Sequence, residues 1–351
     1  IENGTILKGT ITSDVTLAAG NTYKLSGEYI VEEGATLHIE EGVKIIAVYD
    51  DIADYILVKQ GGKINAVGTP DKPIVMTSEK EEPGAWGGIH ICGRAHTNAE
   101  GGKGSSEIGG AVYGGNDDAD NSGTLQYIRL EYTGFAFDEE HEANGISFYG
   151  VGNGTIVDHC QAYKGSDDGF EFFGGSVNVS NLVAVSCSDD SFDWTEGWNG
   201  KGTNLVAYQE AESTLGYDCD CLMECDNNGS NNAATPVAHP VLKNLILVGN
   251  GGSKQGIRLR AGTEVEIDNA KVCGKGQPLT VETALTENAL KNGTSKLTNI
   301  TLTSELSSKE GIYTHADFIA VTSNKVDANL SYSSFEDIRK ECSWMNGSWV
   351  K

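Results

Sequence analysis

Two short motifs alternate along the chain, and their repetition constrains the fold more than any other feature of the sequence. The segment 169–175 (GFEFFGG) aligns with 191–197 (SFDWTEG) at an offset of 22 residues, and a pair of aspartates precedes each copy. Related copies lie at 145–150, 222–226 and 256–262. Like motifs recur every 22 to 40 residues, which is typical of a solenoid whose coils each add one strand to each of several parallel sheets.

The second motif starts with asparagine and continues with apolar residues. We expect these asparagines to stack at one corner of the coils, with each side chain hydrogen-bonding to the backbone there. Tyr127 and His159 occupy the same place in earlier repeats. The motif is present at Asn181–Ala184, Asn204–Ala207, Asn244–Leu247, Asn269–Val272 and Asn299–Leu302.

Alternation within the first motif assigns its side chains to two faces of a strand, because successive residues point to opposite sides. The apolar residues predict an inward face and their neighbours an outward face. The inward set is Phe170, Phe172, Phe192, Trp194, Met223, Cys225, Ile257 and Leu259. Helical periodicity is nearly absent, apart from one short helix expected within Glu282–Asn292. The fold class predicted is all-β, a single-stranded right-handed parallel β-helix.

One domain is expected over residues 1–351. Residues 1–80 contain further β-branched runs, which predict a set of N-terminal coils. The terminal coils of a solenoid leave strand edges unpaired, and such edges need to be covered. The tail 335–351, with Trp344 and Trp349, is apolar enough that we expect it to cover the last coil.

The charge of the chain excludes several classes of partner. Fifty acidic residues against 25 lysines and arginines give a net charge of −25. A chain this acidic repels phosphate backbones and anionic lipid surfaces, so we expect no nucleic-acid partner. It contains no run of 18 or more apolar residues, so no transmembrane segment is expected. The 45 glycines fit a chain that turns at the corners of stacked coils.

Eight cysteines are scattered along the chain, and three of them fall within Cys219–Cys225. A zinc site there lacks a CxxC pair and a nearby histidine. A disulfide from Cys219 or Cys221 to Cys187 is the favoured interpretation if the protein is exported. The chain starts at Ile1 with no methionine and no apolar leader, which together with the acidity favours a processed, exported product.

Seven segments give the chain a specific family resemblance. They are Gly34–Leu37, Gly68–Ile74, Gly84–Ile89, Gly114–Leu125, Ser166–Gly175 (SDDGFEFFGG), Asp190–Trp198 and Asn204–Ala207. They resemble exported or lipid-anchored β-helix proteins of Gram-negative bacteria, including Bacteroides-type lipoproteins of unassigned function. The resemblance implies a pectin-lyase-like fold and a location at the cell surface or outer membrane, or in the periplasm or medium. It transfers no chemistry, because we associate no established reaction with this family.

Stacking of the first motif predicts two outward columns of side chains. The first contains Ser147, Glu171, Asp193, Glu224 and Arg258, and the second contains Tyr149, Phe173, Thr195, Asp226 and Arg260. Adjacent strands lie about 4.8 Å apart, so the carboxylates of one column repel each other and their pKa values rise unless a cation or arginine compensates. Such a solvated acidic face could also lack any function.

Carboxylates beside an arginine on a β-helix face resemble the polysaccharide sites of pectin-lyase-like enzymes, where a calcium ion and an arginine base can share the work. The candidate catalytic residues are Glu171, Asp193, Glu224 and Arg258. The candidate ligand-binding residues are Tyr149, Phe173, Asp226 and Arg260. No cofactor is required by this interpretation, although calcium is a candidate. The aspartate pairs at 167/168 and 189/190 have a second interpretation, as caps of turns.

A second candidate cation site alternates oxygen-bearing residues as the start of a calcium loop does. Its ligands would be Asn116, Asp118 and Asp120. The segment lacks the glycine and the glutamate that complete an EF-hand, so the alternative is a turn held by its own side chains.

Three functional hypotheses follow. The leading one is an exported, surface-associated protein that binds a polysaccharide or another extended ligand on the outward face. The second is a polysaccharide lyase or glycoside hydrolase that uses the stacked carboxylates and arginine. The third is an architectural or adhesive protein whose face meets a protein partner at the cell surface.

Overall fold

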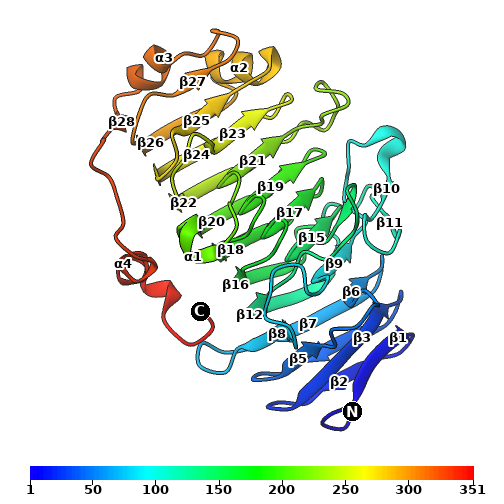
Figure 1. The fold of residues 1–351 in the computed structure, drawn as a ribbon. Coiled ribbons are helices and arrows are strands. Elements are labelled where there is room, and N and C mark those ends of the chain that lie inside the picture. The colour runs from blue at the N-terminus through cyan, green and yellow to red at the C-terminus, as the bar shows by residue number, and fades with distance from the viewer.

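The computed structural model describes residues 1–351 as a parallel β-helix (Figure 1). Strands of successive coils pair in parallel, and antiparallel pairing is limited to two short hairpins. The predicted all-β solenoid is confirmed. The two sequence motifs form the strands of two stacks of paired strands along the coils.

One stack of strands carries the first motif, and we call it the acidic sheet. Its pairing follows the predicted offset, since Phe170 is aligned with Phe192 and Glu171 with Asp193. The stack continues in parallel pairs on both sides of these strands. Its strands are β6 (Tyr55–Val58), β9 (Ile89–Cys92), β15 (Ile146–Tyr149), β17 (Phe170–Phe173), β19 (Phe192–Thr195), β21 (Met223–Asp226), β23 (Gln255–Arg260), β25 (Gln277–Val281) and β27 (Ser307–Ser308).

A second stack carries the asparagine motif, and we call it the asparagine sheet. Its strands are β12 (Gly123–Glu131), β16 (Ile156–Tyr163), β18 (Asn178–Val185), β20 (Lys201–Tyr208), β22 (Val241–Val248), β24 (Glu266–Cys273), β26 (Lys296–Leu302) and β28 (Lys325–Val326).

Each of the seven long strands β12 to β26 bends at one residue with positive φ. These residues are Tyr127, His159, Asn181, Asn204, Asn244, Asn269 and Asn299, with φ between 52° and 64°. Asparagine tolerates this left-handed conformation better than most residues, which explains its repetition at the bend.

The asparagine ladder differs from the prediction in its hydrogen bonds. Asn204 Nδ2 donates to Asn181 Oδ1 at 2.9 Å, and Asn244 Nδ2 donates to Asn204 Oδ1 at 3.1 Å. Asn269 continues the series to Asn244 at 2.8 Å. The ladder therefore joins side chain to side chain across the coils rather than side chain to backbone, because the left-handed bend aims each carboxamide along the stack.

The remaining elements form the N-terminal coils, the hairpins and the helices. The N-terminal strands are β1 (Ile6–Ile11), β2 (Val15–Leu17), β3 (Thr22–Val31), β4 (Thr36–Ile39), β5 (Lys44–Ala47), β7 (Lys63–Val67) and β8 (Ile74–Ser78). The hairpins are β10–β11 (Gly104–Ser105 and Val112–Tyr113) and β13–β14 (Ala136–Asp138 and His141–Glu142). The helices are η1 (Glu100–Gly102), α1 (Glu212–Leu215), α2 (Ala284–Lys291), α3 (His315–Ala320), α4 (Phe335–Glu341) and η2 (Ser343–Met345).

The core runs along the inside of the coils, and all eight residues predicted to point inward are buried. Aromatic rings stack through several coils, since Phe148 lies 4.9 Å from Phe172 and Phe172 lies 4.0 Å from Trp198 between ring centroids. Burial of such large apolar side chains is the main favourable contribution to folding.

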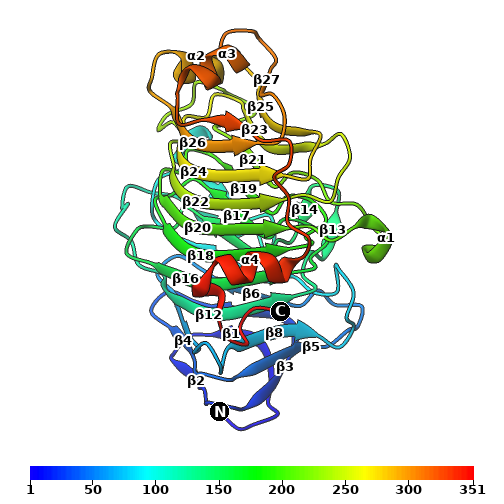
Figure 2. The ribbon, with the colours of Figure 1, turned by 90° about the vertical axis from the view of Figure 1, so that its left-hand side faces the viewer.

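The C-terminal tail takes a different course from the one predicted. The last coil is covered by α2 and α3, whose Leu290 and Phe318 join the core. The tail 335–351 instead runs back over the asparagine sheet, and Figure 2 shows α4 lying across its strands. There Trp349 and Ile338 pack against Val183 and Val206. The outward apolar residues of this sheet therefore provide the surface that the tail covers.

All eight cysteines are buried and unpaired, so the expected disulfide from Cys219 or Cys221 to Cys187 is not present. No helix combines the length and the apolar character that crossing a membrane requires.

Candidate functional site

The predicted first column of outward side chains lies in register on the acidic sheet. Ser147 is aligned with Glu171, Asp193 with Glu224, and Glu224 with Arg258 on successive strands. The second column is aligned from Tyr149 through Phe173 to Thr195, and again from Asp226 to Arg260. The alignment of the repeats therefore placed these side chains correctly in register.

The C-terminal half of the two columns is a network of ion pairs. Glu224 Oε1 lies 3.2 Å from Arg258 Nη1 and 2.9 Å from Arg260 Nη2. Arg260 Nε lies 2.8 Å from Asp226 Oδ1, and Arg258 Nε lies 3.2 Å from Glu282 Oε2. Burial is the largest effect on the pKa of Arg260 and lowers it, but the hydrogen bond to Asp226 and the charges of Asp226 and Glu224 together outweigh burial and raise the pKa of the guanidinium. Both arginines are thus fully engaged with carboxylates.

The N-terminal half of the first column has no cationic partner. Glu171 and Asp193 make no ion pair, and Glu171 Oε2 accepts a hydrogen bond from Asn144 Nδ2 at 2.7 Å. Burial, followed by repulsion from Glu107, raises the pKa of Glu171 well above its ordinary value. Burial and the charge of Glu171 raise the pKa of Asp193 in the same way. The first column therefore has two parts. Glu224 is neutralised by arginines, whereas Glu171 and Asp193 favour a bound proton or a cation.

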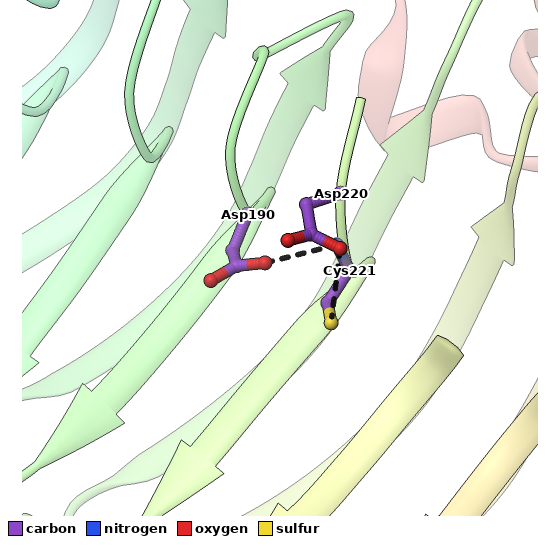
Figure 3. Close-up of side chains that lie close together, drawn as sticks. All are labelled: Asp190, Asp220 and Cys221. Atoms are coloured by element: carbon purple, nitrogen blue, oxygen red, sulfur yellow. Dashed lines mark hydrogen bonds between the residues drawn. The ribbon is translucent and has the colours of Figure 1, made fainter. Parts of the chain in front are cut away.

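Four aspartates form a corner beside this unpaired half, and we call it the aspartate corner: Asp167, Asp168, Asp189 and Asp190. Asp168 Oδ1 accepts the backbone amide of Asp190 at 2.9 Å, and Asp190 Oδ1 accepts that of Cys221 at 2.9 Å. These contacts join successive coils, because the amides lie 22 and 31 residues further on in the chain, and they differ from the predicted capping of each aspartate's own turn. Asp190 and Asp220 also approach Cys221 closely, as Figure 3 shows.

The two aromatic candidates are not available to a ligand. Tyr149 and Phe173 stack with ring centroids 4.4 Å apart, as adjacent strands predict. Their exposed fractions are only 1% and 5%, because residues of the β10–β11 hairpin region such as Ile108 and Tyr113 cover them. The expectation of an aromatic ligand-binding platform at these positions is therefore wrong for this structure.

Two acidic residues beside this sheet were missed by sequence reasoning, namely Glu107 in the loop of the β10–β11 hairpin and Glu196 just after β19. Glu107 lies close enough to Glu171 for their charges to interact, and burial raises the pKa of Glu107 to about 7. Glu196 accepts hydrogen bonds from Tyr113 at 2.8 Å and from Thr97 at 2.6 Å. Glu196 stands within the aligned motif and could have been noticed there, whereas no repeat marks Glu107.

The candidate calcium loop at Asn116, Asp118 and Asp120 anchors the neighbouring strand. Asp118 Oδ1 accepts the backbone amide of His96 at 3.0 Å and contacts its ring Nδ1 at 2.8 Å. Asp120 Oδ2 accepts the amide of Arg94 at 2.7 Å. The segment also holds its own turn, because Asp117 Oδ1 accepts the amide of Ala119 at 3.2 Å and Asn121 Oδ1 accepts that of Gly123 at 2.7 Å. These contacts match the alternative of a turn held by its side chains, and calcium at this loop stays a prediction.

A cavity of about 350 Å³ lies away from the acidic sheet, between the asparagine sheet and the tail. Asn204, Asn244 and Trp344 are among its lining residues. We take the acidic sheet as the candidate site because Glu171 and Asp193 have strongly raised pKa values, and carboxyl groups with such shifts cluster at functional sites.

The fold and site together define a class of protein, a parallel β-helix with a row of partly exposed carboxylates on one sheet. The chain matches the family described as pectate-lyase-like beta helix domain over residues 9–350, and it belongs to that family. Among solved structures it is similar to the Dettilon tailspike protein, with 9% identity and a TM-score of 0.29. That alignment covers 82% of this chain and 53% of the tailspike chain, so this chain spans about half of the other's length. No curated protein sequence matches the chain.

Proposed function

We propose that this protein binds a polysaccharide along the acidic sheet. The observation that carries the proposal is the row of Glu171, Asp193 and Glu224, which are partly exposed and aligned on three successive strands. A row of equivalent groups at about 4.8 Å intervals matches a ligand that is itself linear and repetitive. Membership of the pectate-lyase-like family supports the same class of ligand.

The charge balance favours a neutral polysaccharide over an acidic one. Arg258 and Arg260 are neutralised by Glu224, Asp226 and Glu282, which leaves no free cation on this part of the sheet for an anionic sugar. The chain as a whole carries a net charge of −25, so a uronate-rich polymer is repelled. Carboxylates in contrast accept hydrogen bonds from sugar hydroxyls.

A glycan-binding assay on the full chain tests this proposal. We expect binding to a neutral polysaccharide, and at least a tenfold loss of affinity in the double variant Glu171→Gln, Asp193→Asn, which keeps side-chain size and removes both carboxyl groups. Glu305→Gln is a matched control, because Glu305 is exposed and lies away from the row. Absence of binding across a broad glycan array, or unchanged affinity of the double variant, would contradict the proposal.

Hydrolysis of the bound glycan is the second candidate, and one observation favours it. Glu171 and Asp193 have raised pKa values while Glu224 is held by arginine, and carboxyl groups in such different environments are typical of acid–base pairs. Glu171 and Asp193 lie on adjacent strands, which are about 4.8 Å apart. This is near the separation of roughly 5 Å between the two carboxyl groups of retaining glycosidases. The lyase hypothesis loses support because Arg258 is engaged by two carboxylates. Release of reducing ends that stops in Glu171→Gln would establish hydrolysis.

The proposal includes export to the cell surface, as the family resemblance implies. Protease treatment of intact cells, followed by detection of the chain, tests this part separately. A protein partner at the surface is compatible with glycan binding.

A further inference from the structure

The β10–β11 hairpin is attached to the coils mainly through its side chains. Its two strands pair with each other, and no backbone–backbone hydrogen bond joins residues 103–113 to the coils. The tip is held together internally, because the Ser106 amide donates to Ala111 O at 2.8 Å and Ser106 Oγ donates to Ile108 O at 2.7 Å. The hairpin can therefore move as one unit.

Glycines flank the hairpin on both sides. Gly101 and Gly102 precede it with φ of 79° and 71°, and Gly114 follows it with φ of 104°. Glycine moves between backbone regions without the penalty that a β-carbon imposes. A β-carbon at Gly101 or Gly102 would meet no atom within 4 Å, so packing does not fix this end of the hairpin. Both ends can serve as hinges, since a few terminal residues are enough to absorb the change in φ and ψ.

The hairpin covers outward side chains of the acidic sheet that would otherwise meet water. Cys92, Tyr149 and Phe173 are only 0%, 1% and 5% exposed. The ring of Tyr113 lies 5.0 Å from that of Tyr149 between centroids, and Ala111 O lies 3.9 Å from Cys92 Sγ. Movement of the hairpin would therefore uncover the stacked pair of Tyr149 and Phe173.

Two carboxyl groups meet where the tip of the hairpin lies on the sheet. Glu107 is carried by the tip and Glu171 by β17. The charge of Glu107 is the largest influence on the pKa of Glu171 after burial, and both raise it. The Glu107 amide donates to the Tyr149 hydroxyl at 3.2 Å, which holds the tip against the same strand stack.

The groups that surround these two carboxyls are mostly acidic. His141 supplies a positive charge, but its Nδ1 is already paired with Asp138 Oδ1 at 2.7 Å. The titratable groups that interact with them are His141, Glu142 and Tyr113 beside Glu107, Asp167, Asp168 and Asp193 beside Glu171, and Tyr149 and Glu196 beside both. Negative charge at the tip therefore finds little compensation.

We propose that the β10–β11 hairpin is a lid, which stays closed over Tyr149 and Phe173 while Glu107 and Glu171 are protonated and opens when they ionise. Ionisation places two like charges beneath the tip, and a carboxylate favours the water that an open lid admits. Opening exposes two stacked rings beside the carboxylate row, where the face of a sugar ring can pack. Only this last role rests on the proposed glycan binding.

The direction of the pH dependence follows from the closed state. Burial raises the pKa of Glu107 to about 7 and outweighs the opposing charge of His141. The closed lid therefore binds more protons than the open lid near neutral pH. Closure is favoured while Glu107 is protonated, and this preference is lost as pH rises through about 7.

Alkylation of Cys92 in the full chain measures lid opening without any glycan. We expect iodoacetamide at pH 8.5, followed by peptide mass mapping, to label Cys92 about tenfold faster in the wild type than in Glu107→Gln, which keeps the side-chain size and cannot ionise. At pH 5.5 the two proteins should label equally slowly. Comparison of two proteins at one pH cancels the effect of pH on the reactivity of the thiol itself.

Glu100→Gln is the matched control, because Glu100 is exposed and precedes the hairpin, and it should label as the wild type does. Cys225 is the internal reference, since it is fully buried in the core and should stay unlabelled. Equal labelling of the wild type and Glu107→Gln at pH 8.5 would overturn the lid. Labelling of Cys225 together with Cys92 would also overturn it, because that pattern indicates global unfolding. Exposure of Cys92 without any glycan binding at pH 8.5 would support the lid and contradict the proposed function.

Discussion

The carboxylate of Asp168 accepts a hydrogen bond from the backbone amide of Asp190, 2.9 Å away on the next coil. These residues lie 22 positions apart in the sequence and at the same place in two successive repeats. Asp190 repeats the contact with Cys221. Each aspartate thus joins two successive coils by a hydrogen bond, and its carboxylate also belongs to the aspartate corner.

Replacement of Asp190 should separate these two roles. Asp190→Ala leaves the buried Cys221 amide without an acceptor, which costs about 1–3 kcal/mol, whereas Asp190→Asn keeps an acceptor oxygen. We expect the alanine variant to have a free energy of unfolding about 1–3 kcal/mol below that of the asparagine variant. Urea unfolding at pH 5 in EDTA measures the difference. Equal stability of the two variants would show that this hydrogen bond contributes nothing.

The cation-free protein should lose stability as pH rises above 5. Burial raises the pKa of Asp54 to about 7, of Glu107 to about 7 and of Asp189 to about 6. A carboxyl group with a raised folded-state pKa favours folding while protonated, and this contribution is lost as pH rises through that value. Each pKa unit corresponds to roughly 1.4 kcal/mol.

We therefore expect the free energy of unfolding in EDTA to fall by a few kcal/mol, on the order of 2 to 4, between pH 5 and pH 8. Urea unfolding at the two pH values, monitored by tryptophan fluorescence, measures it. Carboxyl groups with lowered pKa values, such as Asp158, are already ionised at pH 5 and do not mask the trend. The buried His90, whose pKa falls to about 4, opposes the trend by about 2 kcal/mol between pH 5 and pH 6.5. Higher stability at pH 8 than at pH 5 would contradict the assigned protonation of the cluster.

The asparagine ladder predicts a measurable cost for one missing rung. Asn204→Ala removes the hydrogen bonds to Asn181 and from Asn244 and leaves an alanine at a φ of 59°, a conformation that asparagine tolerates better. We expect the free energy of unfolding to fall by about 2–3 kcal/mol, from two hydrogen bonds of about 1 kcal/mol each and the strain of a left-handed alanine.

Asn204→Gly is the matched variant, since glycine adopts positive φ without strain. Differential scanning calorimetry on both variants should rank wild type first, glycine second and alanine last. An alanine variant as stable as the glycine variant would mean that the left-handed bend imposes no strain at this position.

The C-terminal tail 335–351 should stabilise the asparagine sheet that it covers. Trp349 is fully buried, its ring lies 5.9 Å from that of Tyr127, and its amide donates to Pro70 O at 3.2 Å. Trp349→Ala should lower the free energy of unfolding by about 3–5 kcal/mol. Hydrogen exchange should show faster exchange in β12 and β16, which lie beneath the tail.

Trp344→Ala is the control for this prediction, because Trp344 belongs to the same tail and is only partly buried. It should cost less stability and leave the exchange of β12 nearly unchanged. Equal effects of the two substitutions would show that Trp349 contributes no more to the stability of the tail than a partly buried tryptophan does.

The alignment of the sequence repeats was sufficient to predict the fold and the register of the site. Parallel stacking has only one register that keeps residues such as Phe172 and Trp194 inside, because a shift by one residue would turn them outward. For the same reason Glu171, Asp193 and Glu224 had to share an outward column. The positive φ at Asn204 was likewise marked by the recurrence of asparagine at one place in the repeat.

Only the tertiary structure decided what surrounds these positions. Tyr149 and Phe173 were placed correctly on the sheet, yet the non-repetitive segment around Ile108 covers them. The pairing of Arg258 with both Glu224 and Glu282 depends on side-chain reach across coils. The tail packs against the asparagine sheet at the side of the solenoid rather than against its last coil. Periodicity in a sequence specifies what each coil shares with its neighbours, whereas insertions and tails have no repeat to position them, and their packing is set by contacts far apart in the chain.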